Sequence, residues 1–173
     1  DEVFEIVHFD FGMPGERRTL FSIDNQTEGV RIGNTWGEIG FNSVAIGPYV
    51  TAEGNRAIAG GFMSQAAGDQ SVAFGYWVNA VGDDSTAIGH GVSATADSSM
   101  ALGYGIDVSG YESVGIGLDN GTTSYECASA NSLCIMGGNV GIGTGTPDEL
   151  LTVDGMIKSE GITIVDPENR TGC

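Results

Sequence analysis

The chain is poor in basic side chains and in long apolar runs. Six Lys and Arg residues face 23 Asp and Glu residues among 173, a formal net charge of −17 at pH 7. Such a surface repels phosphate backbones, so nucleic acid is not expected as a partner. No apolar run reaches the roughly 18 residues of a membrane-spanning helix, so no membrane insertion by this segment is expected.

Residue types that carry covalent or metal chemistry are also scarce. Histidine occurs twice and cysteine three times, and nothing ties His8 or His90 to a nucleophile. Cys-x-x-Cys spacing is missing, and the acidic residues lack the spacing of an EF-hand or a calcium-binding nonapeptide. We therefore expect a protein without enzymatic activity, catalytic residues, metal or cofactor.

The three cysteines form an odd set. Cys127 and Cys134 lie seven residues apart and are candidates for a disulfide, with two free buried thiols as the alternative. Cys173 is then free or pairs with another chain. An acidic, Gly-rich chain with a disulfide favours an oxidising, extracellular setting.

Glycine is abundant, with 29 residues, and it marks a strict internal repeat of fourteen. The phrase Ser-x-Ala-x-Gly, or a close variant, begins at residues 29, 43, 57, 71, 85, 99 and 113. A fixed internal period is typical of a stacked solenoid. Each unit reads as two short strands joined by two tight turns, with glycines where the backbone needs a positive φ or a close approach.

Alternation within the unit separates two strand faces. Positions equivalent to Ala45 and Ala52 hold small residues, which we expect to meet in a narrow lumen that only Ala or Gly can fill. The other face carries large apolar side chains, which must lie outside the coil. We expect this face to be buried against the same face of identical chains. The alternative is a wider monomeric solenoid, for which fourteen residues per coil are too few. The candidate core of the assembly comprises Val44, Ile46, Val72, Phe74, Ile88, Met100, Leu102, Val114 and Ile116.

Aromatic residues recur at the first turn of successive units. Stacked coils would bring them about 4.8 Å apart into a ladder on an outer edge. Aromatic ladders suit sugar faces or protein partners, while packing across a subunit interface is the alternative. The candidate ligand surface comprises Tyr49, Phe62, Tyr76, Trp77 and Tyr104.

The Ser-x-Ala-x-Gly units of residues 29–117 resemble the head repeats of YadA-type trimeric autotransporter adhesins. The resemblance implies an all-β, left-handed parallel β-roll, with three chains intertwined or side by side and the apolar face at the centre. It also implies a location on the cell surface and binding to host matrix or cell-surface partners, without catalysis. A heptad coiled-coil stalk, which a complete adhesin carries, is missing from the sequence.

The flanking segments depart from the repeat. Residues 1–28 are expected to form an N-terminal cap or docking strands, because terminal solenoid units are atypical. Residues 118–138 are expected to form a bulged coil stapled by the disulfide. Residues 139–173 are expected to form a Gly-rich β segment with a hairpin around Asp154 and Gly155. Residues 137–161 resemble a segment of phage tail fibres and surface fibres that often precedes a self-cleaving intramolecular chaperone.

These patterns predict a structural and adhesive fibre segment, presented outside the cell, on a cell surface or on a virion. Its expected partners are its own copies, in a homotrimer that can join end to end, and a host or neighbouring-cell protein or glycan. The alternatives are a phage or phage-like tail fibre fragment and a subunit of an extracellular filament. A polysaccharide-cleaving β-helix enzyme needs a carboxylate groove, for which narrow coils leave little room.

Overall fold

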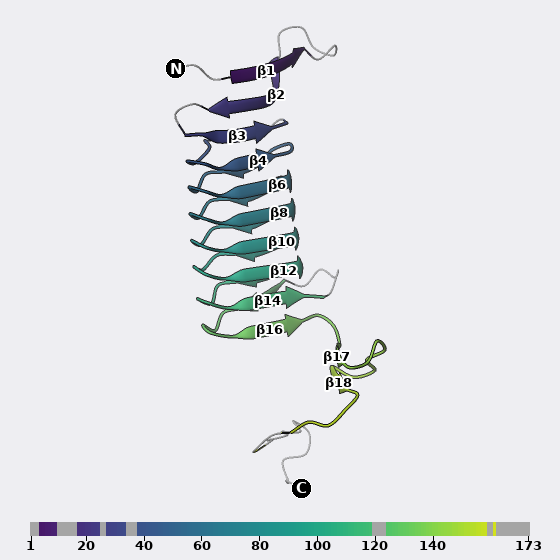
Figure 1. The fold of residues 1–173 in the computed structure, drawn as a ribbon. Helices are drawn as coiled ribbons and strands as arrows, with labels where there is room; N and C mark the ends of the chain where they lie inside the picture. The colour runs from purple at the N-terminus through teal and green to yellow at the C-terminus, as the bar shows by residue number, and fades with distance from the viewer. Residues whose placement is uncertain are drawn as a thin grey trace. The chain divides into compact units, whose positions relative to one another are not determined.

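The computed structural model describes residues 4–9, 17–24, 27–33, 38–118, 124–158 and 161. The chain divides into two compact units, Asp1–Gly138 and Asn139–Cys173. The regular structure of the described residues is β-strand throughout. The first unit is a parallel β-solenoid of about eight turns with about fourteen residues in each, so the predicted solenoid is confirmed (Figure 1).

Two stacks of strands build the solenoid, which we call the long sheet and the short-strand sheet. The long sheet consists of β1 (Phe4–Phe9), β2 (Arg17–Asp24), β3 (Gly29–Ile32), β4 (Val44–Ile46), β6 (Ile58–Phe62), β8 (Val72–Tyr76), β10 (Thr86–His90), β12 (Met100–Tyr104), β14 (Val114–Gly117) and β16 (Leu133–Met136). The short-strand sheet consists of β5 (Thr51–Ala52), β7 (Gln65–Ala66), β9 (Asn79–Ala80), β11 (Ser93–Ala94), β13 (Ile106–Val108) and β15 (Tyr125–Cys127).

The strands from β3 to β16 in the long sheet pair in parallel, each with the equivalent strand of the next coil. β1 and β2 differ, because β2 is antiparallel to β3 and β1 is antiparallel to β2. This antiparallel pair extends the long sheet at its N-terminal edge.

The lumen is filled as the alternation predicts, with one addition. Ala73 and Ala80, from opposite sheets, are fully buried, as are their equivalents in neighbouring coils. The buried set also contains a larger residue immediately before a short strand, or at its first position in β13, so the prediction that only Ala or Gly fits was wrong. These larger lumen residues are Val50, Val78, Val92 and Ile106, with Ser64 in the remaining coil.

The two turns of a coil use glycine for different reasons. Gly75, in the first turn, has a φ of +142°, and a Cβ there would overlap the carbonyl oxygen of Gly89 in the next coil. Gly54, in the second turn, is required only because the next coil lies close to it: a Cβ would overlap the carbonyl oxygen of Gly68. Non-glycine residues occupy left-handed positions beside these glycines, among them Trp77 at φ 55° and Asp84 at φ 56°.

One coil is longer than the others. Ser113 and Ser132, equivalent residues of neighbouring coils, lie nineteen residues apart, five more than the usual fourteen. The extra residues fall between Gly117 and Tyr125, where β14 ends and β15 begins, whereas the chain from Cys127 onward resumes the regular spacing. The five additional residues of this coil therefore come before the cysteines in the sequence.

The second unit contains β17 (Val140–Ile142) and β18 (Leu151–Val153), which pair in parallel. The hairpin predicted around Asp154 and Gly155 is wrong for the described residues, because residues 156–158 form no strand. The loop of residues 143–150 returns the chain so that β18 lies beside β17 in the same direction. Cys173 lies outside the described residues. So do three Asn-x-Thr triplets that are potential N-glycosylation signals, at Asn25, Asn120 and Asn169.

Candidate functional site

The outward side chains of the long sheet form a row that we call the apolar stripe. On β8, Ala73 points into the lumen and is fully buried, whereas its neighbour Phe74 is 38% exposed. Ile46, Ile88 and Met100 occupy the same outer face and are 37–42% exposed. The residues predicted as assembly core thus lie on one face, in register along the stack. The remaining members are half-buried: Val44, Val72, Leu102, Val114 and Ile116.

Phe74 and Gly60 are complementary within the stripe. The two residues are register partners on β8 and β6. A Cβ on Gly60 would lie 2.6 Å from Cδ1 of Phe74, so the ring covers the place that a side chain would need. The glycine that interrupts the Val/Ile pattern at this position therefore accommodates the largest side chain of the stripe.

The aromatic residues of the first turn form two adjoining rows, which touch where Tyr49 contacts Phe62 and where Tyr76 contacts Trp77. The first row, which we call the ring ladder, contains Phe62, Tyr76, His90 and Tyr104, spaced fourteen residues apart. Its successive centroids are 5.3, 4.8 and 4.7 Å apart, with interplanar angles of 12° or less. His90, which was not among the candidate ligand residues, is sandwiched between two tyrosines.

Tyr49 and Trp77 belong to the second row, one position further along the chain. Residues of this row have left-handed φ values, 59° for Tyr49, 52° for Met63 and 55° for Trp77, and Gly91 and Gly105 continue it. The indole N–H of Trp77 donates to the sulfur of Met63. Trp77 is 57% exposed, so the ring remains available to a ligand.

The second turn carries a column of stacked polar side chains. The backbone N–H of Asn55 donates to Asp69 Oδ1 at 2.8 Å, that of Asp69 to Asp83 at 2.8 Å, and that of Asp83 to Asp97 at 3.0 Å. The backbone N–H of Asn55, together with its side-chain amide, lowers the pKa of Asp69. These carboxylates thus satisfy backbone donors of the preceding coil.

Asp107, on the outer face of the short-strand sheet, has the opposite shift. Partial burial raises the pKa of its carboxyl, Thr95 opposes this by donating a hydrogen bond, and the nearby carboxylate of Glu126 adds to it. Asp107 and Glu126 are register partners on β13 and β15. Like charges on adjacent strands disfavour the ionised form.

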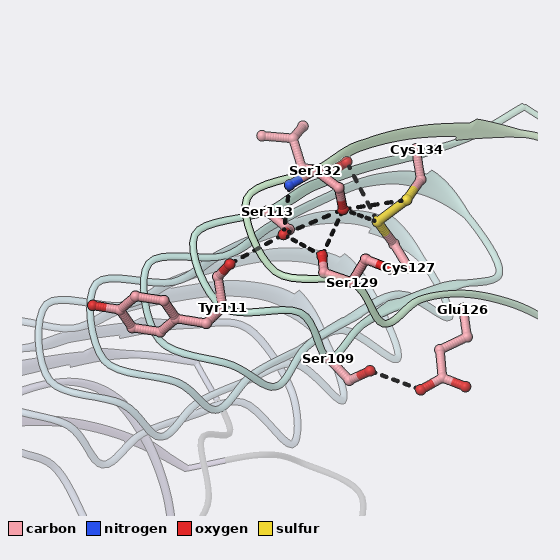
Figure 2. Close-up of a disulfide and its surroundings, with 9 residues drawn as sticks. Ser109, Tyr111, Ser113, Glu126, Cys127, Ser129, Ser132 and Cys134 are labelled. Atoms are coloured by element: carbon pink, nitrogen blue, oxygen red, sulfur yellow. Dashed lines mark hydrogen bonds between the residues drawn. A yellow bond between two sulfur atoms is a disulfide. The ribbon is translucent and has the colours of Figure 1, made fainter.

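A disulfide joins Cys127 to Cys134 in the last coil (Figure 2). Cys127 pairs in register with Val108 on the short-strand sheet, and Cys134 pairs with Gly115 on the long sheet. The disulfide therefore spans the lumen at the position where the coil before it has Val108 and Gly115 and earlier coils have an Ala–Ala pair, such as Ala94 and Ala101. Beside it, the hydroxyl of Ser132 donates to the carbonyl oxygen of Ser129, and its backbone N–H donates to Ser113 Oγ at 3.1 Å.

The separation of seven that made Cys127 and Cys134 disulfide candidates is also the separation of paired lumen residues. Ala52 and Ala59 are seven residues apart and line the same coil, as do Ala80 and Ala87. Cys127 and Cys134 repeat that separation of seven. Once the five-residue insertion is allowed for, the repeat therefore places Cys127 and Cys134 at the two facing lumen positions of one coil.

Two structural features are missing from the described residues. No group of three or more His, Cys, Asp or Glu side chains is arranged to hold a metal ion. The described part of the chain contains no helix long and apolar enough to cross a membrane.

Fold and surface together define a β-solenoid repeat protein with an exposed apolar face. Residues 39–62, 52–76 and 80–105 match the family model described as the YadA head domain repeat. The matched coils are thus similar to head repeats of the adhesin type, which supports a β-roll of solenoid repeats like those of surface proteins. No curated protein matches the chain.

Proposed function

We propose that the chain is a segment of an extracellular, non-enzymatic fibre in which three copies pack their apolar stripes around a common axis. The observation that carries this proposal is the stripe itself, with Phe74 and Ile88 about two-fifths exposed in a single chain. Apolar faces of this kind are typical of association surfaces. Adhesins with YadA-type heads form trimers and bind surface partners, which supports both parts of the proposal.

Within this proposal the roll is left-handed, residues 1–28 cap its N-terminal edge and the disulfide coil closes the other edge. The ring ladder and the row of Tyr49 and Trp77 supply the surface that meets a matrix, protein or glycan partner. Exposed aromatic rings with a polar edge are enriched where proteins bind other molecules. End-to-end joining of trimers would extend the segment into a filament.

A phage or phage-like tail fibre is the second candidate. It is favoured by the second unit, which keeps large apolar side chains exposed, with Leu150 at 77%, Leu151 at 59% and Met156 at 93%. Such residues call for burial by other copies or by a following segment. A chaperone sequence downstream in the complete gene would support the fibre, and an anchor would support the adhesin.

Native mass by light scattering, with and without reductant, tests the assembly. A mass of about three times 17.8 kDa supports the trimer. Larger, polydisperse particles that shrink on reduction support a filament linked through Cys173. A 17.8 kDa monomer refutes packing of the stripes. Turnover of any glycan in a broad panel would refute the absence of enzymatic activity.

A further inference from the structure

A groove runs along the outer side of the short-strand sheet, beside the first turn. One part has a volume of about 590 Å³ and is lined by residues that include Tyr49, Gln65 and Asn79. A second part, of about 340 Å³, includes Trp77 and Ser93 in its lining. Met63 and Asn79 line both parts, so the two are continuous across four neighbouring coils.

The groove has one polar side and one aromatic side. Its polar side is a row of outward side chains from β5, β7, β9 and β11, which are in register: Thr51, Gln65, Asn79 and Ser93. Each coil thus contributes one neutral hydrogen-bonding group, about 4.8 Å from the next. The aromatic side is the row of Tyr49, Met63 and Trp77, at left-handed positions of the first turn.

Two groups in the groove are available to a ligand. Trp77 is 57% exposed and its indole N–H is already directed at Met63. One face of its ring stacks on Tyr76, with centroids 5.7 Å apart, so the opposite face is what it offers. Asn79 forms a backbone hydrogen bond to the next coil, but its side-chain amide has no partner among the described residues. Gln65 donates to Glu53 Oε1 at 3.3 Å, which orients its amide at the edge of the groove.

Charge narrows the class of ligand. Glu53 is the one charged residue in the lining of the two parts. The chain has a formal net charge of −17, which repels anionic ligands. The outward side chains of β5, β7, β9 and β11 that line the groove are uncharged, and the carboxylate of Asp107 continues their row only beyond Ser93. A neutral ligand fits best.

We propose that this groove binds a neutral, unbranched glycan chain, with a sugar face on the Trp77 ring and hydroxyl groups on Gln65 and Asn79. The C–H face of an equatorial pyranose is complementary to the electron-rich face of an aromatic ring. Amide and hydroxyl side chains match the donors and acceptors of sugar hydroxyls. The regular row of one polar group per coil favours a polymer with its own regular repeat. This inference rests on the proposed role as a surface fibre and names its ligand class.

The groove and the apolar stripe belong to different sheets of the same coil. In the groove, Trp77 follows β8 and Asn79 lies on β9. In the stripe, Phe74 lies on β8 and Ile88 lies on β10. Substitutions in the groove can therefore be read separately from assembly through the stripe.

Fluorescence titration of the full chain tests the proposal. Trp36→Phe leaves Trp77 as the sole tryptophan, because the chain has two. The probes are cellohexaose and N-acetylchitohexaose, with isothermal titration calorimetry as the second readout. We expect a saturable change in Trp77 emission with at least one probe. A lack of saturable binding to both by either method overturns the proposal.

Trp77→Gly, made in the native background and measured by calorimetry, removes the ring at a position where glycine is already tolerated, since Gly91 and Gly105 continue the same row. We expect it to weaken binding about tenfold, as for truncation of a central aromatic contact. Tyr111→Ala is the matched control, because Tyr111 is 51% exposed but lies in the second turn, away from the groove. Asn79→Ala supplies an independent loss if Trp77→Gly fails to fold. Undiminished binding by a folded Trp77→Gly refutes the site.

Attachment to cells separates this inference from the proposed function. Periodate cleaves vicinal diols, so oxidation of the target cells should abolish attachment if the partner is a cellulose-like neutral glycan. A chain of β-1,4-linked N-acetylglucosamine resists periodate, and for that partner added N-acetylchitohexaose should block attachment. Attachment that survives periodate and survives Trp77→Gly indicates a protein partner, which overturns the groove but retains the surface fibre. A monomeric chain that still binds cellohexaose or N-acetylchitohexaose through Trp77 retains the groove and refutes the fibre.

Discussion

Val108 and Gly115 face each other across the lumen of one coil, and the size of one compensates for the other. A Cβ on Gly115 would lie 2.5 Å from Cγ2 of Val108 and 2.8 Å from Cδ1 of Ile106. In the four preceding coils both positions hold alanine, as with Ala94 and Ala101. The lumen thus has room for a fixed side-chain volume at each coil, so a larger residue on one sheet requires a smaller residue on the other.

This relationship predicts a non-additive pair of substitutions. Val108→Ala should cost about 2 kcal/mol of unfolding free energy through the cavity it leaves. Gly115→Ala should cost about 1–3 kcal/mol because its methyl group overlaps Val108. The double variant restores the Ala–Ala pair, so its cost should be smaller than the sum by about 1 kcal/mol or more. Chemical denaturation of the four proteins measures the coupling, and strict additivity would contradict it.

Charges placed on the apolar stripe should dissociate the assembly. Ile88→Asp with Leu102→Asp puts unpaired carboxylates where the proposed trimer buries apolar surface, which costs several kcal/mol for each charge. Light scattering should then report 17.8 kDa. Val81→Asp with Tyr111→Asp is the matched control, because both residues are about half exposed and lie outside the stripe. A double stripe variant that keeps its trimeric mass shows that the stripe is not the interface.

Two glycines of neighbouring first turns should differ in their tolerance of alanine. A Cβ on Gly75 would overlap the carbonyl oxygen of Gly89, so Gly75→Ala must separate the coils and should be strongly destabilising. Gly91 has nothing within 4 Å of its Cβ position and a φ of +62°. Gly91→Ala should therefore cost only the left-handed conformation, about 1 kcal/mol. Melting temperatures of the two variants, measured side by side, check the order.

Removal of the disulfide should loosen one coil without disrupting the lumen. Cys127→Ala with Cys134→Ala restores the Ala–Ala pair of the regular coils, so only the crosslink is lost. Closing a loop of this length contributes about 2.5 kcal/mol in the chain-entropy model. Hydrogen exchange should accelerate in β15 and β16 and stay unchanged in β8 and β10. Accelerated exchange throughout the solenoid would show that the disulfide supports the whole stack.

Acid should act in opposite directions through two carboxylates. The pKa of Asp69 is lowered by donors from Asn55, so its stabilisation is present above the unfolded pKa of about 4 and is lost as pH falls through the lower, folded pKa. The pKa of Asp107 is raised by burial, so its ionised form destabilises above the folded pKa and this penalty disappears on acidification.

Two amide variants separate these contributions. Asp69→Asn should lower the melting temperature near pH 6, and the difference from the parent should shrink below about pH 4. Asp107→Asn should raise the melting temperature near pH 6 and lose that gain in acid. Thermal unfolding across pH 2 to 7 measures both, and the same sign for the two variants at pH 6 would contradict the assignment.

The repeat was predictable because it is local and periodic. Seven copies of one phrase place Ala45 and its equivalents on one strand face and Ile46 and its equivalents on the other, and strand alternation then assigns inside and outside. The larger lumen residue, such as Val78, was missed because a two-residue strand is too short to show alternation. The hairpin around Asp154 was wrong because an Asp-Gly pair indicates a turn but not the partner of the strand before it.

By itself the sequence determined the period, the parallel solenoid and the apolar outer face, since each depends only on the order of residues within one coil. Tertiary structure decided which side chains of neighbouring coils contact one another. It separated the ring ladder from the row of Trp77, brought His90 between two tyrosines, and placed Cys127 opposite Cys134 across the lumen. The separation of the two rows depends on turn geometry. The residue after each member of the ring ladder has a left-handed φ, so its side chain points in a different direction from the ring before it. A shift of one position along the chain thus becomes a different surface of the fibre.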